Sequence, residues 1–266
     1  MEFTTNRPLR VFEAFAGYGS QSMALTRLKQ HNPGFDFEVI GISEISRNAV
    51  KAYMAVHGSH IHNYGDITKI VWEELPDFDL FTYSFPCQDI STAGKQRGFV
   101  QGTGTRSSLL WECAKAIETK RPKYLLMENV KALIQRKFMP EFNKWIEWLD
   151  NQCYRSFHQV MNAKHYGVPQ NRERVFMVSI LDPTGNFKFP EPFPLEKKLR
   201  DVLENEVGQK YYLSDDRVQK IIDHCDRKQA EGCGFSHDFN DGKGTSNTLL
   251  TRYGQRETDT YLKEPE

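Results

Sequence analysis

An apolar run at residues 78–83 most constrains the fold, because it must stop before Pro86. Its length and aromatic content are those of a buried strand, and proline has no N–H to donate to a strand ladder. Cys87 therefore lies just beyond a strand end. In an open α/β sheet, ligands bind at the carboxyl ends of the strands. Cys87 is either a reactive thiol at such an end or a small hydrophobe in the core, and this stretch alone leaves both readings open.

The composition narrows the class of protein. The 266 residues suffice for one large domain, or for one domain with a small appendage. The sequence contains no apolar stretch of membrane-spanning length and no signal-peptide core, which predicts a cytoplasmic protein without membrane contact. Five cysteines without a Cys-x-x-Cys pair favour reduced thiols over a disulfide framework or a zinc site. Basic and acidic residues balance at 35 each, so charge neither indicates nor excludes a nucleic-acid partner.

A glycine turn follows the first predicted strand. Residues 9–15 predict a strand, residues 16–20 a turn and residues 21–30 a helix. Gly17 and Gly19 let the backbone approach a ligand closely, and the helix N-terminus offers unpaired N–H groups. The full dinucleotide fingerprint is absent, so the turn alone is compatible with ligand binding and with an ordinary tight turn.

Carboxylates occupy the next two predicted strand ends. Glu44 closes a strand at residues 37–44, roughly twenty residues beyond the glycine turn, where it can accept hydrogen bonds from ribose hydroxyls. Asp66 lies in a turn at residues 64–68, near a predicted third strand end, where it can accept from an adenine amino group. A solvated helix cap is the ordinary alternative for such a carboxylate. Three strand ends that converge on one nucleoside explain the pattern better than coincidence.

A long loop and a further strand end follow Cys87. Residues 91–106 are polar and rich in glycine, which predicts a lid or binding loop. A buried strand at residues 122–127 then ends in Glu128-Asn129-Val130. Glu128 is either a functional carboxylate near Cys87 or a solvent-facing residue at a strand end.

Two arginines precede the last predicted strand of this half, at residues 175–180. Arg172 and Arg174 stand at alternate positions of an extended chain and therefore project the same way. Their planar guanidinium groups are suited to bind phosphate or carbonyl oxygens. Salt-bridged surface arginines are the alternative.

A change in composition at residues 182–194, rich in proline and phenylalanine, predicts a domain boundary. Residues 1–181 are expected to form the larger domain. Residues 182–266 contain too few apolar residues for a second independent core of any size.

Together, these motifs resemble those of the cytosine-5 DNA methyltransferase family. The matching set is Phe15-Ala16-Gly17-Tyr18-Gly19, Glu44, Asp66, Phe85-Pro86-Cys87-Gln88, Glu128-Asn129-Val130 and Gln170-Asn171-Arg172-Glu173-Arg174. Each motif is short, but their order and spacing are specific. The resemblance implies an α/β fold with a Rossmann-like S-adenosylmethionine-dependent methyltransferase sheet. Residues 1–181 would then be the catalytic and cofactor-binding domain, and residues 182–266 a small target-recognition region.

The resemblance implies a site for S-adenosylmethionine, whose product is S-adenosylhomocysteine. The glycine turn and Phe15 would hold the cofactor, Glu44 its ribose and Asp66 its adenine. The residues expected to bind the cofactor are Phe15, Gly17, Tyr18, Gly19, Ser20, Glu44, Ile45, Asp66, Ile67 and Phe85.

The resemblance also implies catalytic roles for four residues. Cys87 would attack C6 of cytosine, which makes C5 nucleophilic enough to take a methyl group. Glu128 would hydrogen-bond N3 and the amino group of the ring. Arg174 would reach the cytosine carbonyl oxygen or the surroundings of the cysteine, and Arg172 would help to hold the site and a backbone phosphate.

The implied partner is duplex DNA, methylated as in restriction-modification systems. Because C6 is inaccessible inside a duplex, the cytosine must flip out, and residues 91–106 would close over it. The residues expected to contact DNA are Gln88, Ser91, Arg97 and Arg106.

The sequence departs from the family pattern at its C-terminal end. Residues 248–254 resemble the stretch that precedes the last conserved segment of the family. That segment itself does not occur in the sequence up to Glu266. The expectation is a truncated form, or one subunit of a two-chain enzyme in which a second chain supplies the missing motifs. A catalytically idle DNA-binding or regulatory module of the same fold is the alternative function. An RNA cytosine-5 methyltransferase is a weaker reading, because the Cys-Phe-Thr signature expected of the tRNA-modifying branch is absent.

Overall fold

The computed structural model describes residues 3–90, 98, 100, 105–232, 238–249 and 260–263. The chain divides into two compact units. Unit 1 comprises Met1–Val160 and Arg174–Phe189, and unit 2 comprises Met161–Glu173 and Pro190–Glu266. The segment that carries Arg172 thus groups with unit 2, although it precedes the composition change at residues 182–194.

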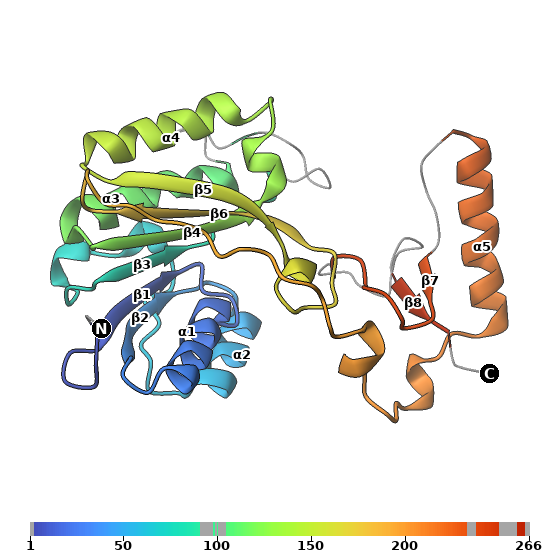
Figure 1. Ribbon diagram of the computed structural model, residues 1–266. Helices are drawn as coiled ribbons and strands as arrows, with labels where there is room; N and C mark the ends of the chain where they lie inside the picture. Colours follow the sequence, from blue (N-terminus) through green and yellow to red (C-terminus); the bar gives the residue numbers. More distant parts are fainter. Residues whose placement is uncertain are drawn as a thin grey trace. The chain divides into compact units, whose positions relative to one another are not determined.

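Unit 1 is built on a sheet in which, within the described residues, six strands have the order β2-β1-β3-β4-β6-β5 (Figure 1). The strands are β1 (Leu9–Ala14), β2 (Phe37–Ser43), β3 (Leu80–Tyr83), β4 (Tyr124–Val130), β5 (Arg155–Asn162) and β6 (Glu173–Ile180). The strands β2, β1, β3 and β4 pair in parallel, and β6 runs antiparallel to β4. The strand order reverses between β1 and β3, and open α/β sheets bind their ligands at such a switch point.

Helices cover both faces of this sheet. They are α1 (Ser20–His31), α2 (Arg47–His57), α3 (Leu110–Lys120) and α4 (Met139–Asn151). Figure 1 shows α1 and α2 beside β1 and β2, and α4 beside β5. Phe12 belongs to the core that contains buried residues of α3 and α4, whereas Val11 belongs to a second core with Leu25 of α1. The strand β1 is thus covered on both faces, and all of its residues except Arg10 are buried.

The strand β3 forms a rigid support for the residues that follow it. All of its residues are buried, as expected for residues 78–83, and Phe81 stacks on Tyr83 at 5.5 Å between ring centroids. The indole N–H of Trp145 on α4 donates to the hydroxyl of Tyr83 at 3.3 Å. Each of these large side chains contributes about 1.5–3 kcal/mol by leaving water. The carboxyl end of β3 is therefore held firmly in the core.

The predicted strands of unit 1 are confirmed except for the one before Asp66. There the chain forms an isolated parallel bridge between Asn63 and Ile42, in which Tyr64 N–H donates to the carbonyl of Ile42 at 2.8 Å. The expected third strand end is thus wrong. The run between His60 and Gly65 is polar and short, so it adds a brief contact at the edge of β2 and not a full strand.

Unit 2 contains α5 (Asp215–Ala230) and a parallel pair of strands, β7 (Asp238–Asn240) and β8 (Thr260–Leu262). The Ser214 hydroxyl caps α5 by accepting from Arg217 N–H at 3.3 Å. Only Ile221 and Cys225 of this helix are buried, so its packing is light.

Short 3₁₀ helices connect the main elements. They are η1 (Ile67–Lys69), η2 (Trp72–Glu74), η3 (Arg106–Leu109), η4 (Lys131–Ile134), η5 (Ala163–His165), η6 (Leu199–Val202) and η7 (Gln209–Tyr211). Among the helices of the described chain, none combines the length and the apolarity that a membrane span requires.

Candidate active site

The glycine turn joins β1 to α1 at the switch point. Phe15, Gly17 and Gly19 have φ angles of 55°, 59° and 82°, so the backbone is left-handed at three positions. For Phe15 this costs of order 1 kcal/mol, a strain that proteins keep where the turn must have one shape. A Cβ on Gly17 would meet no atom within 4 Å, so the turn faces open space at this residue. The turn can therefore admit a ligand close to its backbone.

Glu44 ties this turn to the end of β2. Its Oε2 accepts from Gly17 N–H at 3.0 Å, and its Oε1 accepts from Ser46 N–H at 2.7 Å. Asn63 holds the backbone of Glu44 from both sides, since its Oδ1 accepts from Glu44 N–H and its Nδ2 donates to Glu44 O, each at 3.0 Å. A carboxylate oxygen has a second lone pair, so Glu44 can still accept from a ligand hydroxyl.

The other expected cofactor residues differ in exposure. Asp66 accepts from Thr68 N–H at 3.0 Å and from its hydroxyl at 2.9 Å, and these hydrogen bonds lower the pKa of Asp66. Ile67 is buried in the main core, whereas Ile45 and Tyr18 are 76% and 55% exposed. Exposed apolar side chains at strand ends can contact a ligand directly. Ile67 is buried, so only the small exposed part of its side chain can do so.

The loop after β3 is held by side chains from two other elements. Asn129 Nδ2 on β4 donates to the carbonyl of Phe85 at 3.0 Å, and the Ser107 hydroxyl donates to the carbonyl of Pro86 at 2.6 Å. Phe85 is buried and Cys87 is half-buried. Because Tyr83 pairs with Met127, Cys87 follows the carboxyl end of β3 and Glu128 lies near the carboxyl end of the neighbouring parallel strand β4.

The first helix also contacts this loop. The side-chain amide of Gln21, in the first turn of α1, donates to the hydroxyl of Ser84 at 2.9 Å. The glycine turn and the loop that carries Cys87 therefore meet at the same edge of the sheet. This is the edge at which both β1 and β3 end.

Glu128 forms an ion pair with Arg174, whose Nε lies 3.0 Å from Oε1 of the carboxylate. Arg174 pairs with Val130 across the β4–β6 ladder. Residues opposite each other share a face, as do Glu128 and Val130 two positions apart, so the geometry of the sheet brings Arg174 to Glu128.

Arg172 belongs to unit 2. Its backbone N–H donates to Asn162 Oδ1 at 3.1 Å. The adjoining segment pairs with a distant part of unit 2, since Asn171 N–H donates to Ser246 O at 2.8 Å and the Thr248 hydroxyl donates to Asn171 O at 2.8 Å. The two arginines of the motif are thus held by different units.

The expected DNA contacts are described only in part. Gln88 is exposed in the loop after β3. Ser91 and Arg97 lie outside the described residues, as does most of the expected lid at residues 91–106. Arg106 begins η3, which follows this loop.

The roles of Asn63, Asn129 and Glu13 at this edge were not predicted from the sequence. Asn63 and Asn129 hydrogen-bond backbone groups far away in the sequence, which no local pattern reveals. Glu13 is fully buried within β1. A charged residue inside an otherwise apolar strand was the available signal for Glu13.

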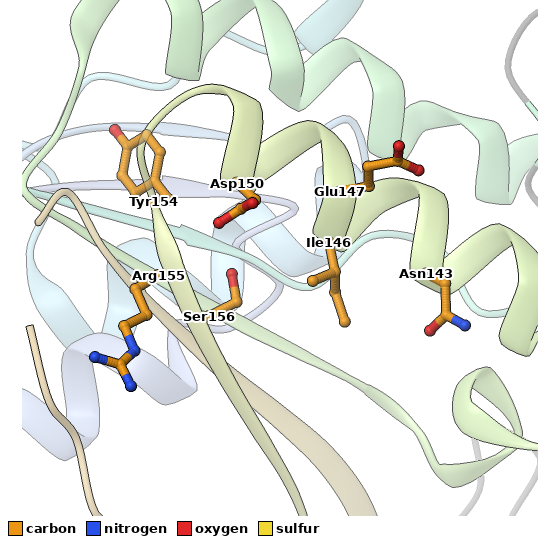
Figure 2. A pocket seen from close by; sticks show the side chains of 7 residues that line it. All are labelled: Asn143, Ile146, Glu147, Asp150, Tyr154, Arg155 and Ser156. Atoms are coloured by element: carbon orange, nitrogen blue, oxygen red, sulfur yellow. The ribbon is translucent and has the colours of Figure 1, made fainter. Parts of the chain in front are cut away.

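A separate cavity of about 480 Å³ lies between α4 and the start of β5 (Figure 2). Its lining consists of Asn143, Ile146, Glu147, Asp150, Tyr154, Arg155 and Ser156. None of the residues expected from the sequence to bind or react belongs to this lining.

Comparisons with known proteins agree with this geometry. The family model for C-5 cytosine-specific DNA methylase matches residues 9–264. Type II methyltransferase M2.ScrFI of Lactococcus lactis subsp. cremoris is 41% identical over 262 residues, covering 79% of this chain and 71% of the relative. Type II methyltransferase M.NlaX of Neisseria lactamica is 31% identical over 257 residues, covering 96% and 79%. The chain spans about half the length (51%) of the orphan methyltransferase M.Rho11sI of Bacillus phage rho11s, at 31% identity over 266 residues and 88% of this chain.

The fold is similar to that of a solved methyltransferase. The S. pombe Dnmt2 methyltransferase superposes with a TM-score of 0.73 at 21% identity, covering 97% of this chain and 77% of that chain. At this identity the likeness shows the fold alone. Because the family model extends over nearly the whole sequence, and two type II methyltransferases share 31% and 41% of the aligned residues, this chain belongs to the family of C-5 cytosine-specific DNA methylases.

Proposed function

We propose that this protein transfers a methyl group from S-adenosylmethionine to C5 of a cytosine that is flipped out of duplex DNA, through a covalent bond between Cys87 and C6. The observation that carries the proposal is the hydrogen bond from Asn129 to the carbonyl of Phe85, which ties the loop of Cys87 to the strand end of Glu128. A thiol and a carboxylate from neighbouring strand ends are the pair that this chemistry requires.

The residues of the glycine turn fit the proposed cofactor. Gly17 faces open space, and Glu44 fixes the backbone of the turn while keeping lone pairs for hydroxyl groups. Ile45 and Tyr18 offer exposed apolar surface at the same strand ends. We assign Phe15, Gly17, Tyr18, Gly19, Ser20, Glu44, Ile45, Asp66, Ile67 and Phe85 to this site. S-adenosylmethionine supplies an electrophilic methyl group on a positively charged sulfur.

The steps at the base follow from the side chains. The Cys87 thiolate forms a bond to C6, and the electron pair of the C5=C6 double bond then forms the new bond from C5 to the methyl group. The bond between that methyl group and the donor sulfur would break, and S-adenosylhomocysteine would leave. Glu128, in its protonated form, donates a hydrogen bond to N3 and accepts one from the amino group, which stabilises the negative charge that the attack at C6 places on the ring. A base then removes the proton from C5, the C5=C6 double bond forms again, and the bond to the Cys87 sulfur breaks.

Arg174 and Arg172 would complete the site. Arg174 would orient Glu128 through their ion pair, and its guanidinium is of the type that binds a carbonyl oxygen such as that of cytosine. Arg172 would contact a backbone phosphate. Gln88, Ser91, Arg97 and Arg106 are the proposed DNA contacts near the flipped base.

The test is covalent trapping on a random-sequence duplex that contains 5-fluorocytosine. Fluorine at C5 prevents the final elimination, so the wild-type protein with S-adenosylmethionine should form a denaturation-resistant adduct. Cys87→Ser should form none. Cys153→Ser is the matched control, because Cys153 is an exposed thiol in the turn between α4 and β5, and it should react like the wild type.

Each other outcome of this assay has a clear meaning. An adduct that persists in Cys87→Ser would overturn the assigned nucleophile. DNA binding without any adduct, even after a second methyltransferase chain is added, would favour an idle binding module over an enzyme. An adduct that appears only with the second chain would support a two-chain enzyme. Methyl transfer to tRNA in place of duplex DNA would overturn the proposed substrate.

A further inference from the structure

Glu13 is a fully buried carboxylate near the carboxyl end of β1. Its Oε1 accepts from Ser22 N–H at 3.0 Å, and its Oε2 accepts from the Ser22 hydroxyl at 2.7 Å and from the Tyr53 hydroxyl. An unpaired buried carboxylate would cost several kcal/mol, roughly, so these three donors are what allow Glu13 to occupy the core. None of the three donors belongs to β1.

The contact with Ser22 caps the first helix. Gly19 is the N-cap of α1 and has no side chain to accept a hydrogen bond, and the first turn of α1 carries no acidic residue. Helices usually satisfy their first N–H groups with an acceptor at the N-cap itself. Here Glu13 supplies that acceptor from the preceding strand, since its Oε1 accepts from Ser22 N–H in the first turn of α1. The start of α1 is thereby fixed relative to β1.

Side chains of α2 pack against the same glycine turn. The ring of Tyr53 on α2 lies 4.6 Å from the ring of His57, and His57 Nε2 lies 3.1 Å from the carbonyl oxygen of Tyr18. A Cβ on Gly19 would come within 2.3 Å of His57 Nε2 and 2.6 Å of Tyr53 Cε2. The glycine turn is therefore enclosed between Glu13 on one side and α2 on the other.

We propose that Glu13 and Tyr53 are positioning residues for cofactor binding: their contact holds the glycine turn in the shape that receives S-adenosylmethionine. The inference rests on the proposed function, because it assumes that this turn binds the cofactor. Both side chains are fully buried, so they act through Ser22, Gly19 and the start of α1 and do not touch the ligand.

Tyr53→Phe tests the inference with little change in volume, and Tyr154→Phe is its matched control. Tyr154 is also buried in unit 1, and its hydroxyl donates to Pro122 O at 2.7 Å, away from the turn. Tyr53→Phe loses the hydroxyl that donates to Glu13 and lies 3.1 Å from the Ser22 hydroxyl, whereas Tyr154→Phe loses the one that donates to Pro122 O. Both variants should therefore lower the melting temperature. Only Tyr53→Phe should raise the Kd for S-adenosylhomocysteine, by about 3- to 10-fold in calorimetry.

Glu13→Gln and steady-state kinetics add two checks. Glu13→Gln should raise the Kd for S-adenosylhomocysteine at least as much as Tyr53→Phe does, since a carboxamide has one acceptor oxygen in place of two. In both variants the KM for S-adenosylmethionine should rise while kcat at saturation stays near the wild-type value. If both variants bind like the wild type although their melting temperatures fall as in Tyr154→Phe, Glu13 and Tyr53 are structural only and the inference is wrong.

Amide hydrogen exchange separates this inference from the proposed function. Exchange at residues 17–22 should be faster in Tyr53→Phe than in the wild type, and unchanged in Tyr154→Phe, without any ligand present. Wild-type protein that binds no S-adenosylhomocysteine would count against the proposed function, and the exchange rates would still decide whether this network holds the turn. Equal rates in all three proteins would overturn the inference.

Discussion

Arg174 and Glu128 meet at 3.0 Å because β6 runs antiparallel to β4. The beginning of β6 thereby lies beside the end of β4, at the edge where β1 and β3 also end. The two side chains are 18% and 23% exposed, and ion pairs in contact with water typically contribute only about 0–1 kcal/mol to stability. The pair is better explained by its effect on the direction of the Glu128 carboxylate than by its effect on folding.

Replacing Arg174 by alanine should lower kcat far more than it lowers stability. Without its cation, Glu128 is no longer held toward the base, and the loss of one such group typically costs about 10²-fold in rate. Methyl transfer to duplex DNA and thermal unfolding measure the two effects. Arg155→Ala is the control, since Arg155 is an exposed residue of β5 whose guanidinium lies over Phe157. Activity of Arg174→Ala equal to that of Arg155→Ala would contradict the assignment.

Glu44→Gln should weaken the binding of S-adenosylmethionine and leave the rate of methyl transfer nearly unchanged. The carboxamide keeps only one oxygen, whereas Gly17 and Ser46 each require one acceptor. We expect the KM for S-adenosylmethionine to rise about tenfold, with kcat within about twofold of the wild type. Glu38→Gln on the exposed side of β2 should behave like the wild type. A fall in kcat without a change in KM would argue against a cofactor role for Glu44.

The two glycines of the turn should respond differently to alanine. Both have positive φ, which costs of order 1 kcal/mol for alanine, but only at Gly19 would the new Cβ collide with other atoms. Gly19→Ala should therefore unfold at a clearly lower temperature than Gly17→Ala. Gly17→Ala should remain folded and lose affinity for S-adenosylhomocysteine, because its methyl group fills the open space in front of the turn. Similar melting temperatures for the two variants would refute this reading of the contacts.

The stability of the protein should depend on pH through Glu13. Burial raises the pKa of Glu13 above its ordinary value of 4.5, while hydrogen bonds from Tyr53 and Ser22 and the charge of His57 partly oppose this rise. Above pH 4.5 the unfolded chain releases this proton before the folded chain does, so the free energy of unfolding contributed by Glu13 falls as pH rises through this window.

Urea unfolding of wild type and Glu13→Gln at a series of pH values isolates this effect. His57 is present in both proteins, so their difference reports mainly on Glu13. The wild type should lose stability relative to Glu13→Gln as pH increases from 4.5 to the raised pKa, and the difference should then level off. A difference that does not vary with pH would show that the pKa of Glu13 is not raised.

The sequence allowed prediction of three strand ends, at residues 15, 44 and 83, because apolar runs that stop at turn residues indicate where buried strands end. The strands end at Ala14, Ser43 and Tyr83, within one residue of these positions. The sequence did not allow prediction of how these ends are joined. The Asn129 contact with Phe85 and the Asn63 contact with Glu44 link segments that are distant in sequence. Such contacts depend on strand order, which hydrophobic periodicity does not encode.

The expected strand before Asp66 shows a different limit. A turn with glycine after a short extended run reads like other strand ends of this chain, but the backbone hydrogen bonds to β2 there are those of His62 and Tyr64 with Ile42, on either side of the bridge residue Asn63. A single bridge and a strand differ in how many residues find partners, and this depends on the neighbouring strand. The direction of β6 was equally hidden, since an isolated strand has no orientation until it pairs.

The interleaving of the two units governs how the protein can be dissected or recombined. A fragment that stopped at Phe189 would keep Asn171 but lose Ser246 and Thr248, and with them the hydrogen bonds that hold the segment at residues 161–173. A chimera that borrows unit 2 from a relative must therefore transplant residues 161–173 together with the part that follows Phe189. If only the later part were exchanged, the grafted sequence would have to pair with a segment that evolved alongside a different partner.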